Sequence, residues 1–344
     1  QNWYRKTAGN LHQLTISSRA RAATGEPDAL LLRRPAAAMA LRAHPAHPPP
    51  LPMAVTTGRN ASYDARRTPK PAMPPDHSQT NDHASDWPAA SSPMLHIEAG
   101  VATLTLNRPA QRNSLSDADL QVLLQHLDSI EADAAVRVLV LAARVQPQRP
   151  VFSAGYHMGG FEADASQGPQ GFERVCAALA RVRPVTLCAL NGSVYGGATD
   201  LALACDFRLG VQGMELRMPA AALGLHYCAG GLQRFVARLG LGAARRIFLL
   251  AQPLSADELL RLGYLDALVA PEALPTEVER WCHNLVQLAP LALQGMKQSL
   301  QEIALGEHNA TAWREREAHT QRSADFAEGR AAFAQRRPAV FLGR

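Results

Sequence analysis

One stretch, Asn191-Gly-Ser-Val-Tyr-Gly-Gly-Ala-Thr-Asp200, constrains the fold of this chain more than any other. An apolar run from Val185 to Leu190 leads into it, and small residues from Leu201 to Cys205 follow it. This succession predicts a buried strand, a glycine turn and the N-terminus of a helix. Gly196 and Gly197 have no Cβ, so the backbone can turn sharply and a ligand can approach closely. The first helical amides suit an anion, either a bound phosphate or an oxyanion that forms during a reaction.

The composition allows a large hydrophobic core. The chain has 344 residues, of which 47% are hydrophobic and 19% charged, enough for one large domain or two ordinary ones. No uninterrupted apolar run approaches the length of a membrane span. The cysteines are odd in number and show no C-x-x-C spacing, which is typical of reduced thiols in an intracellular protein and disfavours a metal site. They are Cys176, Cys188, Cys205, Cys228 and Cys282.

The N-terminal quarter differs from the rest. Residues 1–93 contain 13 of the 24 prolines and 11 Lys/Arg against 6 Asp/Glu, whereas residues 94–344 carry 24 of each charge. We therefore expect no nucleic-acid binding by the globular part. Residues 1–93 are predicted to be a disordered Pro/Arg-rich extension, with Met94 as an expected start and a cytoplasmic location. The alternative is a mitochondrial presequence, because several arginines fall among apolar residues, although acids and prolines interrupt them.

Strands alternate with helices from Met94 onward, which predicts an α/β fold with a largely parallel sheet and a helical C-terminal part. Ser116 with Asp119 predicts a capped helix N-terminus. The predicted strands are two within 96–106, then 138–143, one from 151 into a glycine turn, 185–190, 207–211 and 265–269. The predicted helices are one after Ser116, then 170–182, 231–250, 255–262, 272–288, 290–304 and 310–334.

A second strand runs into a glycine turn at Ala154-Gly155-Tyr156, about forty residues before Gly196-Gly197. Glycine after a strand is common, so neither turn alone is specific. Two such turns in adjacent units predict a pair of backbone amides that form an oxyanion hole.

The order of several motifs resembles that of the crotonase (enoyl-CoA hydratase/isomerase) family, from about Met94 to the end of the chain. The motifs are Leu106-Asn-Arg-Pro-Ala-Gln-Arg-Asn-Ser-Leu115, Phe152-Ser-Ala-Gly155, Asn191-Gly with Gly196-Gly197, Ala204-Cys-Asp-Phe207, Gly230-Gly-Leu-Gln-Arg234, Ser323-Ala-Asp-Phe-Ala-Glu-Gly-Arg-Ala-Ala-Phe333 and Arg336-Arg-Pro338. The resemblance implies a spiral of ββα units over 94–285 and a helical trimerisation region over 286–344. It also implies a homotrimer or a dimer of trimers.

The resemblance further implies an acyl-CoA thioester substrate and no metal or other cofactor. Its oxyanion hole falls on the amides of Tyr156 and Gly197, and its first carboxylate falls on Asp200. Ala154, Gly155, His157 and Gly196 would lie at the substrate. Arg112 and Lys297 are the candidates for contacts with CoA phosphates, and a solvated basic residue is the alternative for each. The loop 158–170, with Met158-Gly-Gly-Phe161, suggests an apolar surface along the acyl chain.

The sequence departs from the family pattern at the second carboxylate, which falls on Ala220. A third position, an aspartate in some relatives, holds Cys228 within His226-Tyr-Cys228. These three side chains can carry protons or attack carbon, although a structural histidine and a buried thiol are the alternatives. Asp200 is alternatively a first-turn acid that favours the helix dipole. His157 stands where an acid is usual.

We therefore expect an acyl-CoA enzyme that stabilises a thioester enolate, with Asp200 as proton carrier and double-bond isomerisation favoured. Hydration with His226 or Tyr227 replacing the missing glutamate is an open alternative. A family member that binds acyl-CoA without turnover is a second alternative, and Ala220 is the residue that supports it.

Overall fold

The computed structural model describes residues 92–157, 159 and 168–344, and all of them belong to one compact unit. The predicted disordered extension, residues 1–93, lies outside the described residues apart from its last two positions. Most of the predicted substrate-lining loop, 158–170, also lies outside them.

A unit of two strands and a helix repeats along the chain. In each repeat the first strand joins a six-stranded sheet and the second joins a four-stranded sheet. The three repeats are β3 (Val138–Ala143), β4 (Val151–Ser153) and α3 (Gly168–Arg181); β5 (Val185–Leu190), β6 (Ser193–Tyr195) and α4 (Ala198–Ala204); and β7 (Phe207–Val211), β8 (Glu215–Arg217) and α5 (Ala229–Leu250). The expected spiral of ββα units is therefore confirmed.

The six-stranded sheet has the order β1-β2-β3-β5-β7-β10 and is parallel except at one edge. There β1 (Met94–Glu98) pairs antiparallel with β2 (Val101–Leu106), as the two short strands predicted within 96–106 require. The four-stranded sheet has the order β4-β6-β8-β9, where β9 is Leu254–Ser255. A single sheet was expected, and β6, β8 and β9, which contain only two or three residues each, were not predicted.

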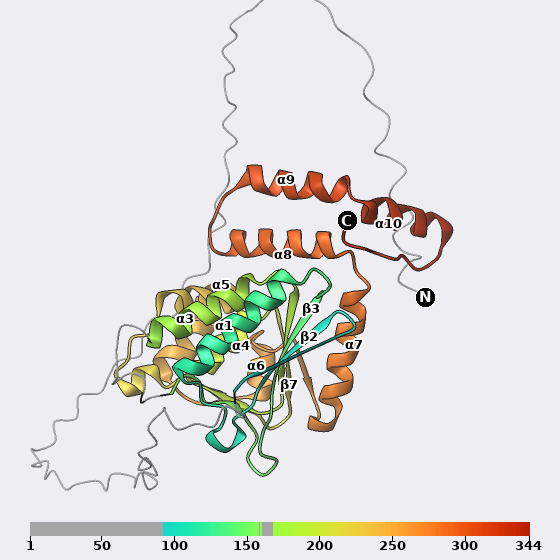
Figure 1. Cartoon of the computed structure of the whole chain (residues 1–344). Coiled ribbons are helices and arrows are strands. Elements are labelled where there is room, and N and C mark those ends of the chain that lie inside the picture. The colour runs from blue at the N-terminus through green and yellow to red at the C-terminus, as the bar shows by residue number, and fades with distance from the viewer. Residues whose placement is uncertain (1–91, 158, 160–167) are drawn as a thin grey trace, which may run out of the picture. The chain divides into compact units, whose positions relative to one another are not determined.

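Helices cover both sides of the large sheet (Figure 1). α1 (Asp117–Ala132) and α3 lie side by side on one side, and α7 (Leu274–Val286) packs against β3, β5 and β7 on the other. α1 begins with the predicted capping box, in which the Ser116 hydroxyl and the Asp119 carboxylate each accept the other residue's backbone amide. Every residue of β5 is buried, as expected for a parallel strand covered on both faces.

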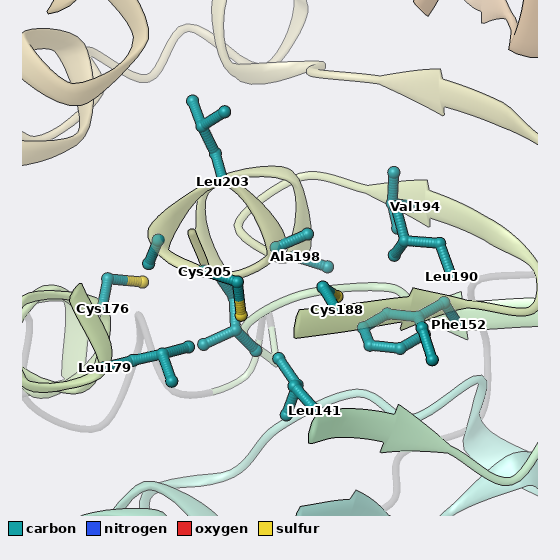
Figure 2. Packing of buried hydrophobic residues seen from close by; sticks show 14 of the residues in the cluster. Leu141, Phe152, Cys176, Leu179, Cys188, Leu190, Val194, Ala198, Leu203 and Cys205 are labelled. Atoms are coloured by element: carbon teal, nitrogen blue, oxygen red, sulfur yellow. The ribbon is translucent and has the colours of Figure 1, made fainter. Parts of the chain in front are cut away.

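α4 lies inside the core. Figure 2 shows Ala198 of α4 and Cys205, which ends the helix, among side chains from β3, α3 and β5. Every residue of α4 is buried. Its alanine side chains are small, so the surrounding elements can approach the helix closely. This packing fixes the position of the helix start, where the glycine turn described below is found. All five cysteines are free thiols, and four of them are buried.

The C-terminal part is helical, as predicted. α6 (Ala256–Arg261) and β10 (Ala267–Val269) precede α7, and α8 (Pro290–Ala304) follows it, so the predicted boundary at 285/286 falls at the end of α7. The single helix predicted over 310–334 is wrong. It consists of α9 (Ala310–Gln321) and α10 (Ala324–Gln335), because Ser323 leaves the helical conformation and caps α10 through Phe326 N. Among the described helices, none combines the length and apolarity that a membrane crossing requires.

Candidate active site

The two glycine turns touch each other. Gly155 has φ of +85°, and a Cβ built on it would lie 2.6 Å from the backbone nitrogen of Gly197 and 2.9 Å from the carbonyl oxygen of Tyr195. Only glycine fits this position, because both the left-handed φ and the close approach exclude a side chain. Two loops forty residues apart therefore present their backbones at one place.

The segment before α1 holds the first turn. The Ser153 hydroxyl donates to the Asn113 carbonyl (2.7 Å) and accepts from the Gly155 amide (3.0 Å). The Leu115 amide donates to the Gly155 carbonyl and the His157 amide donates to the Leu115 carbonyl, each at 2.9 Å. These bonds lie on both sides of Tyr156 and fix the direction of its peptide group.

Asn113 belongs to the Leu106–Leu115 motif and fixes the first turn. Its fully buried side chain donates to the carbonyls of Arg144 (2.7 Å) and Phe152 (2.9 Å) and accepts from the Arg108 amide (2.7 Å). Buried amides need such partners. This residue therefore joins three segments and holds the first turn in place.

The second turn leads directly into α4. The Gly196 amide donates to the Arg217 carbonyl (3.0 Å), and the Gly197 carbonyl accepts the amides of Asp200 (2.9 Å) and Leu201 (3.0 Å). Gly197 is therefore the N-cap of α4. A backbone amide at this position has no acceptor within the helix.

Phe172 of α3 lies against both turns. A Cβ on Gly197 would lie 2.8 Å from Cζ of its ring, and the ring centroids of Phe172 and Tyr156 are 6.3 Å apart. The Tyr156 hydroxyl donates to Asp117 at 2.8 Å, and burial together with this bond raises the pKa of Tyr156. The side chain of Tyr156 is thus tied to the start of α1.

Asp200 is fully buried and its two oxygens differ. Oδ1 accepts a hydrogen bond from Arg234 Nε at 2.7 Å, within an ion pair. Oδ2 is buried and has no hydrogen-bond partner among the described residues. Burial lowers the pKa of Arg234, but the charge of Asp200 and the hydrogen bond to it outweigh that effect, and its pKa lies above the ordinary value.

Tyr227 is a second buried polar group at this place. Its ring packs on Phe248 with centroids 5.3 Å apart, and its hydroxyl has no partner within the described part of the chain. Burial, with a further contribution from the charge of Asp200, raises the pKa of Tyr227 well above its ordinary value. The phenol therefore retains its proton at neutral pH.

The neighbours of Tyr227 have other environments. His226 is exposed, and its Nδ1 lies 2.8 Å from the carbonyl of Tyr227. Cys228 is half-buried at the N-cap of α5, and burial raises its pKa to about 11, so the thiolate needed for nucleophilic attack is scarce at neutral pH. Ala220 is a buried methyl group at the start of a short 3-10 helix.

The remaining predicted residues are spread around this centre. Arg112 is exposed, and its carbonyl accepts the Ala154 amide at 2.8 Å. His157 is half-buried, and its ring lies against Gly159. Lys297 is buried, and its Nζ lies 2.7 Å from both Asp206 and the Pro184 carbonyl. The charge of Lys297 is therefore engaged at the junction of α8 and the sheet, whereas a CoA contact from Arg112 stays a prediction.

Neither Arg234 nor Phe172 was predicted from the sequence as a site residue. Tyr227 was predicted only as an alternative to the missing glutamate. A signal for Arg234 was present, since Gly231 and Arg234 are one helical turn apart and face the same side. The helix α5 thus places both Gly231 and the cationic side chain of Arg234 next to Asp200.

Comparison with known proteins identifies the family. The family model described as enoyl-CoA hydratase/isomerase matches residues 96–344. The 2,3-dehydroadipyl-CoA hydratase of Escherichia coli is 31% identical over 71% of this chain and 96% of its own, and the 1,2-epoxyphenylacetyl-CoA isomerase of the same organism is 28% identical over 73% and 98%.

The fold is likewise shared with solved structures. An enoyl-CoA hydratase/isomerase family protein from Hyphomonas neptunium is similar with a TM-score of 0.68 and 25% identity, over 73% of this chain and 98% of that one. Sequence motifs, repeated ββα units and touching glycine turns lead to one conclusion. The chain belongs to the enoyl-CoA hydratase/isomerase family.

Proposed function

We propose that this enzyme isomerises the double bond of an enoyl-CoA thioester, with Asp200 as proton carrier. The observation that carries the proposal is the contact of Gly155 with Gly197, three residues before a buried carboxylate whose Oδ2 has no partner among the described residues. Two backbone amides and one proton-carrying oxygen are the groups that enolate chemistry needs.

The chemistry begins at the thioester carbonyl. The amides of Tyr156 and Gly197 bind its oxygen and stabilise the negative charge that forms there. A single donor of this kind is worth about 3 kcal/mol of transition-state stabilisation. Oδ2 of Asp200 removes a proton from C2 of a 3-enoyl chain, and a proton added at C4 completes the shift of the double bond. The thioester itself activates C2, so we propose no cofactor beyond the CoA of the substrate.

Hydration of a 2-enoyl-CoA is the second candidate. It is favoured by the Tyr227 hydroxyl, which has no partner among the described residues. Hydration requires a group that positions water besides the one that carries a proton, and Ala220 can do neither. The relatives named above include one hydratase and one isomerase. Both reactions use the same enolate and the same oxyanion hole.

A direct assay separates these reactions from binding without turnover. Purified enzyme is supplied with 3-enoyl-CoA and, separately, with 2-enoyl-CoA, and products are separated by HPLC. We expect conversion of the 3-enoyl substrate that falls about 10³-fold in Asp200→Asn, because an amide cannot accept the C2 proton. Equal background rates in wild type and variant, with CoA still bound, would show that the site has no catalytic function.

We also propose that the enzyme is a homotrimer or a dimer of trimers. Met296, Leu300 and Ile303 lie on one face of α8 and are 56%, 65% and 52% exposed, and Phe333 of α10 is 75% exposed. Apolar faces of this kind are typical of surfaces that associate. Light scattering coupled to gel filtration measures the mass, and a monomer at micromolar concentration would contradict the proposal.

A further inference from the structure

Two buried polar atoms near α5 lack partners within the described residues. They are Oδ2 of Asp200 and the hydroxyl of Tyr227. A buried polar atom without a hydrogen bond costs about 1–3 kcal/mol, so two at one place call for a functional explanation.

Gly231 shows that these two side chains converge. A Cβ built on Gly231 would lie 2.3 Å from Cε1 of Tyr227 and 2.9 Å from Oδ2 of Asp200. Both side chains therefore press against the same backbone position, and no residue other than glycine leaves room for them. The charge of Asp200 also contributes to the raised pKa of Tyr227, as expected for close neighbours.

Arg234 distinguishes the two oxygens of Asp200. It lies one turn after Gly231 on the same helix, and its Nε donates to Oδ1 at 2.7 Å. Its side chain is only 13% exposed, so the ion pair is shielded from water. Oδ1 is thereby occupied, and Oδ2 is the oxygen that is left to move a proton.

We propose that Tyr227 supplies the second proton of the reaction beside Gly231, where its side chain and Oδ2 of Asp200 converge, and that Arg234 is the positioning residue that orients Oδ2 of Asp200. This inference rests on the proposed function. In it, Tyr227 carries the second proton, which the methyl group of Ala220 cannot carry.

For a 3-enoyl thioester, the proton transfers form a closed cycle. The C2–H bond breaks, its proton goes to Oδ2 of Asp200, and its electron pair enters the enolate. The O–H bond of Tyr227 then breaks as its proton forms the new C4–H bond with enolate electrons. The proton on Asp200 passes to the phenolate oxygen, which restores both groups without any further reactant.

The other nearby groups fit this task less well. His226 is exposed and directed at its neighbour's carbonyl, and Cys228 is the N-cap of α5. Neither is among the buried side-chain atoms without a partner, whereas the Tyr227 hydroxyl is.

The experiment measures two rates in each variant. Deuterium uptake from D2O at C2 of a saturated acyl-CoA, followed by NMR, reports proton removal by Asp200 alone. Conversion of 3-enoyl-CoA to 2-enoyl-CoA reports the complete reaction. In Tyr227→Phe we expect uptake within about three-fold of wild type but conversion lowered about 10²-fold, the usual size of a general-acid contribution. Tyr195→Phe is the matched control, because its hydroxyl bonds Glu215 at 2.8 Å, and both rates should stay within about two-fold.

Arg234 is tested by the same two rates. Arg234→Gln should lower uptake and conversion together, while acyl-CoA affinity stays within about three-fold, and Arg234→Lys should recover part of both. Arg238→Lys, one turn further along α5, is the control, since Arg238 contacts the Cys205 carbonyl and not Asp200.

The possible results distinguish the role of Tyr227, the role of Arg234 and the proposed function. Conversion by Tyr227→Phe at the wild-type rate, or equal losses of uptake and conversion in it, would overturn the role of Tyr227. Unchanged uptake in Arg234→Gln would overturn the role of Arg234. Absence of both rates in the folded wild-type enzyme would instead refute the proposed function.

Discussion

Two aspartates lie at opposite ends of the short helix α4, and their surroundings differ sharply. Asp206 follows the helix, and its Oδ2 accepts from Thr186 N (2.8 Å), Thr186 Oγ1 (3.0 Å) and Lys297 Nζ (2.7 Å). Asp200, in the first turn, accepts one hydrogen bond on Oδ1 from Arg234. Its Oδ2 has no partner among the described residues.

This difference is the one expected between a structural carboxylate and a catalytic one. A carboxylate that accepts hydrogen bonds from several donors holds chain segments together. Each of these hydrogen bonds offsets part of the free-energy cost of burying the carboxylate charge. In a buried carboxylate with one oxygen free of hydrogen bonds, less of this cost is offset. Such a group is typical of sites where a ligand or a proton binds to the free oxygen. The sequence motifs contain both acids, and only their contacts tell them apart.

Asp200→Asn should produce the largest effect. The amide keeps the shape but cannot accept the C2 proton, so we expect turnover to fall about 10³-fold, equivalent to about 4 kcal/mol in the barrier. The melting temperature should fall as well, because Arg234 loses its counter-ion, so turnover is compared per folded molecule. Steady-state kinetics and thermal unfolding of the same preparation measure both. A variant that loses stability but not turnover would reverse the assignment of the two acids.

Asp206→Asn should lower stability but leave turnover nearly unchanged. It leaves Lys297 buried without its counter-ion, and removal of one partner of a buried pair costs about 3 kcal/mol of unfolding free energy. Burial already lowers the pKa of Lys297, which indicates how costly its charge is there. Turnover per folded molecule should stay within about three-fold. Denaturant unfolding provides the measurement, and adding Lys297→Met should restore part of the stability.

Gly155→Ala should affect the contact between the two turns. A positive φ and a Cβ 2.6 Å from the Gly197 nitrogen should together cost about 2 kcal/mol and separate the amides, lowering turnover about 10²-fold. Gly213→Ala is the matched control, because Gly213 has φ of +82° and no atom within 4 Å of the added Cβ. Equal turnover in the two variants would show that the turn contact does not matter for catalysis.

Cys228→Ser should have the smallest effect. Because burial raises the pKa of Cys228 to about 11, its thiol is protonated at neutral pH, and we expect turnover within about two-fold of wild type. Alkylation by iodoacetamide, followed by mass spectrometry, should accelerate only as pH rises toward about 11. Fast alkylation near pH 7 would contradict this environment.

The sequence predicted the main fold and the two glycine turns because their signals are local. Buried strands, capping residues such as Ser116 and glycines after strands are visible within a few residues. The second sheet was not expected because three of its strands, β6, β8 and β9, are very short and lie beside turns, where no hydrophobic period shows them.

The partners of charged residues could not be predicted for a different reason. Arg234 meets Asp200 from 34 residues away, and Lys297 meets Asp206 across the α8 junction. Such pairs depend on tertiary packing, and sequence spacing does not encode it. For this reason Lys297 was a candidate for CoA binding, whereas the structure places it in an ion pair.

The most direct test of the account compares C2 proton exchange in wild type, Asp200→Asn and Asp206→Asn. Each folded enzyme is mixed with a saturated acyl-CoA in D2O, and NMR follows deuterium uptake at C2. We predict uptake in wild type, a loss of about 10²-fold or more in Asp200→Asn, and near-normal uptake in Asp206→Asn. Equal uptake by the two variants, or none in wild type that binds the thioester, would contradict the role of Asp200 as proton carrier.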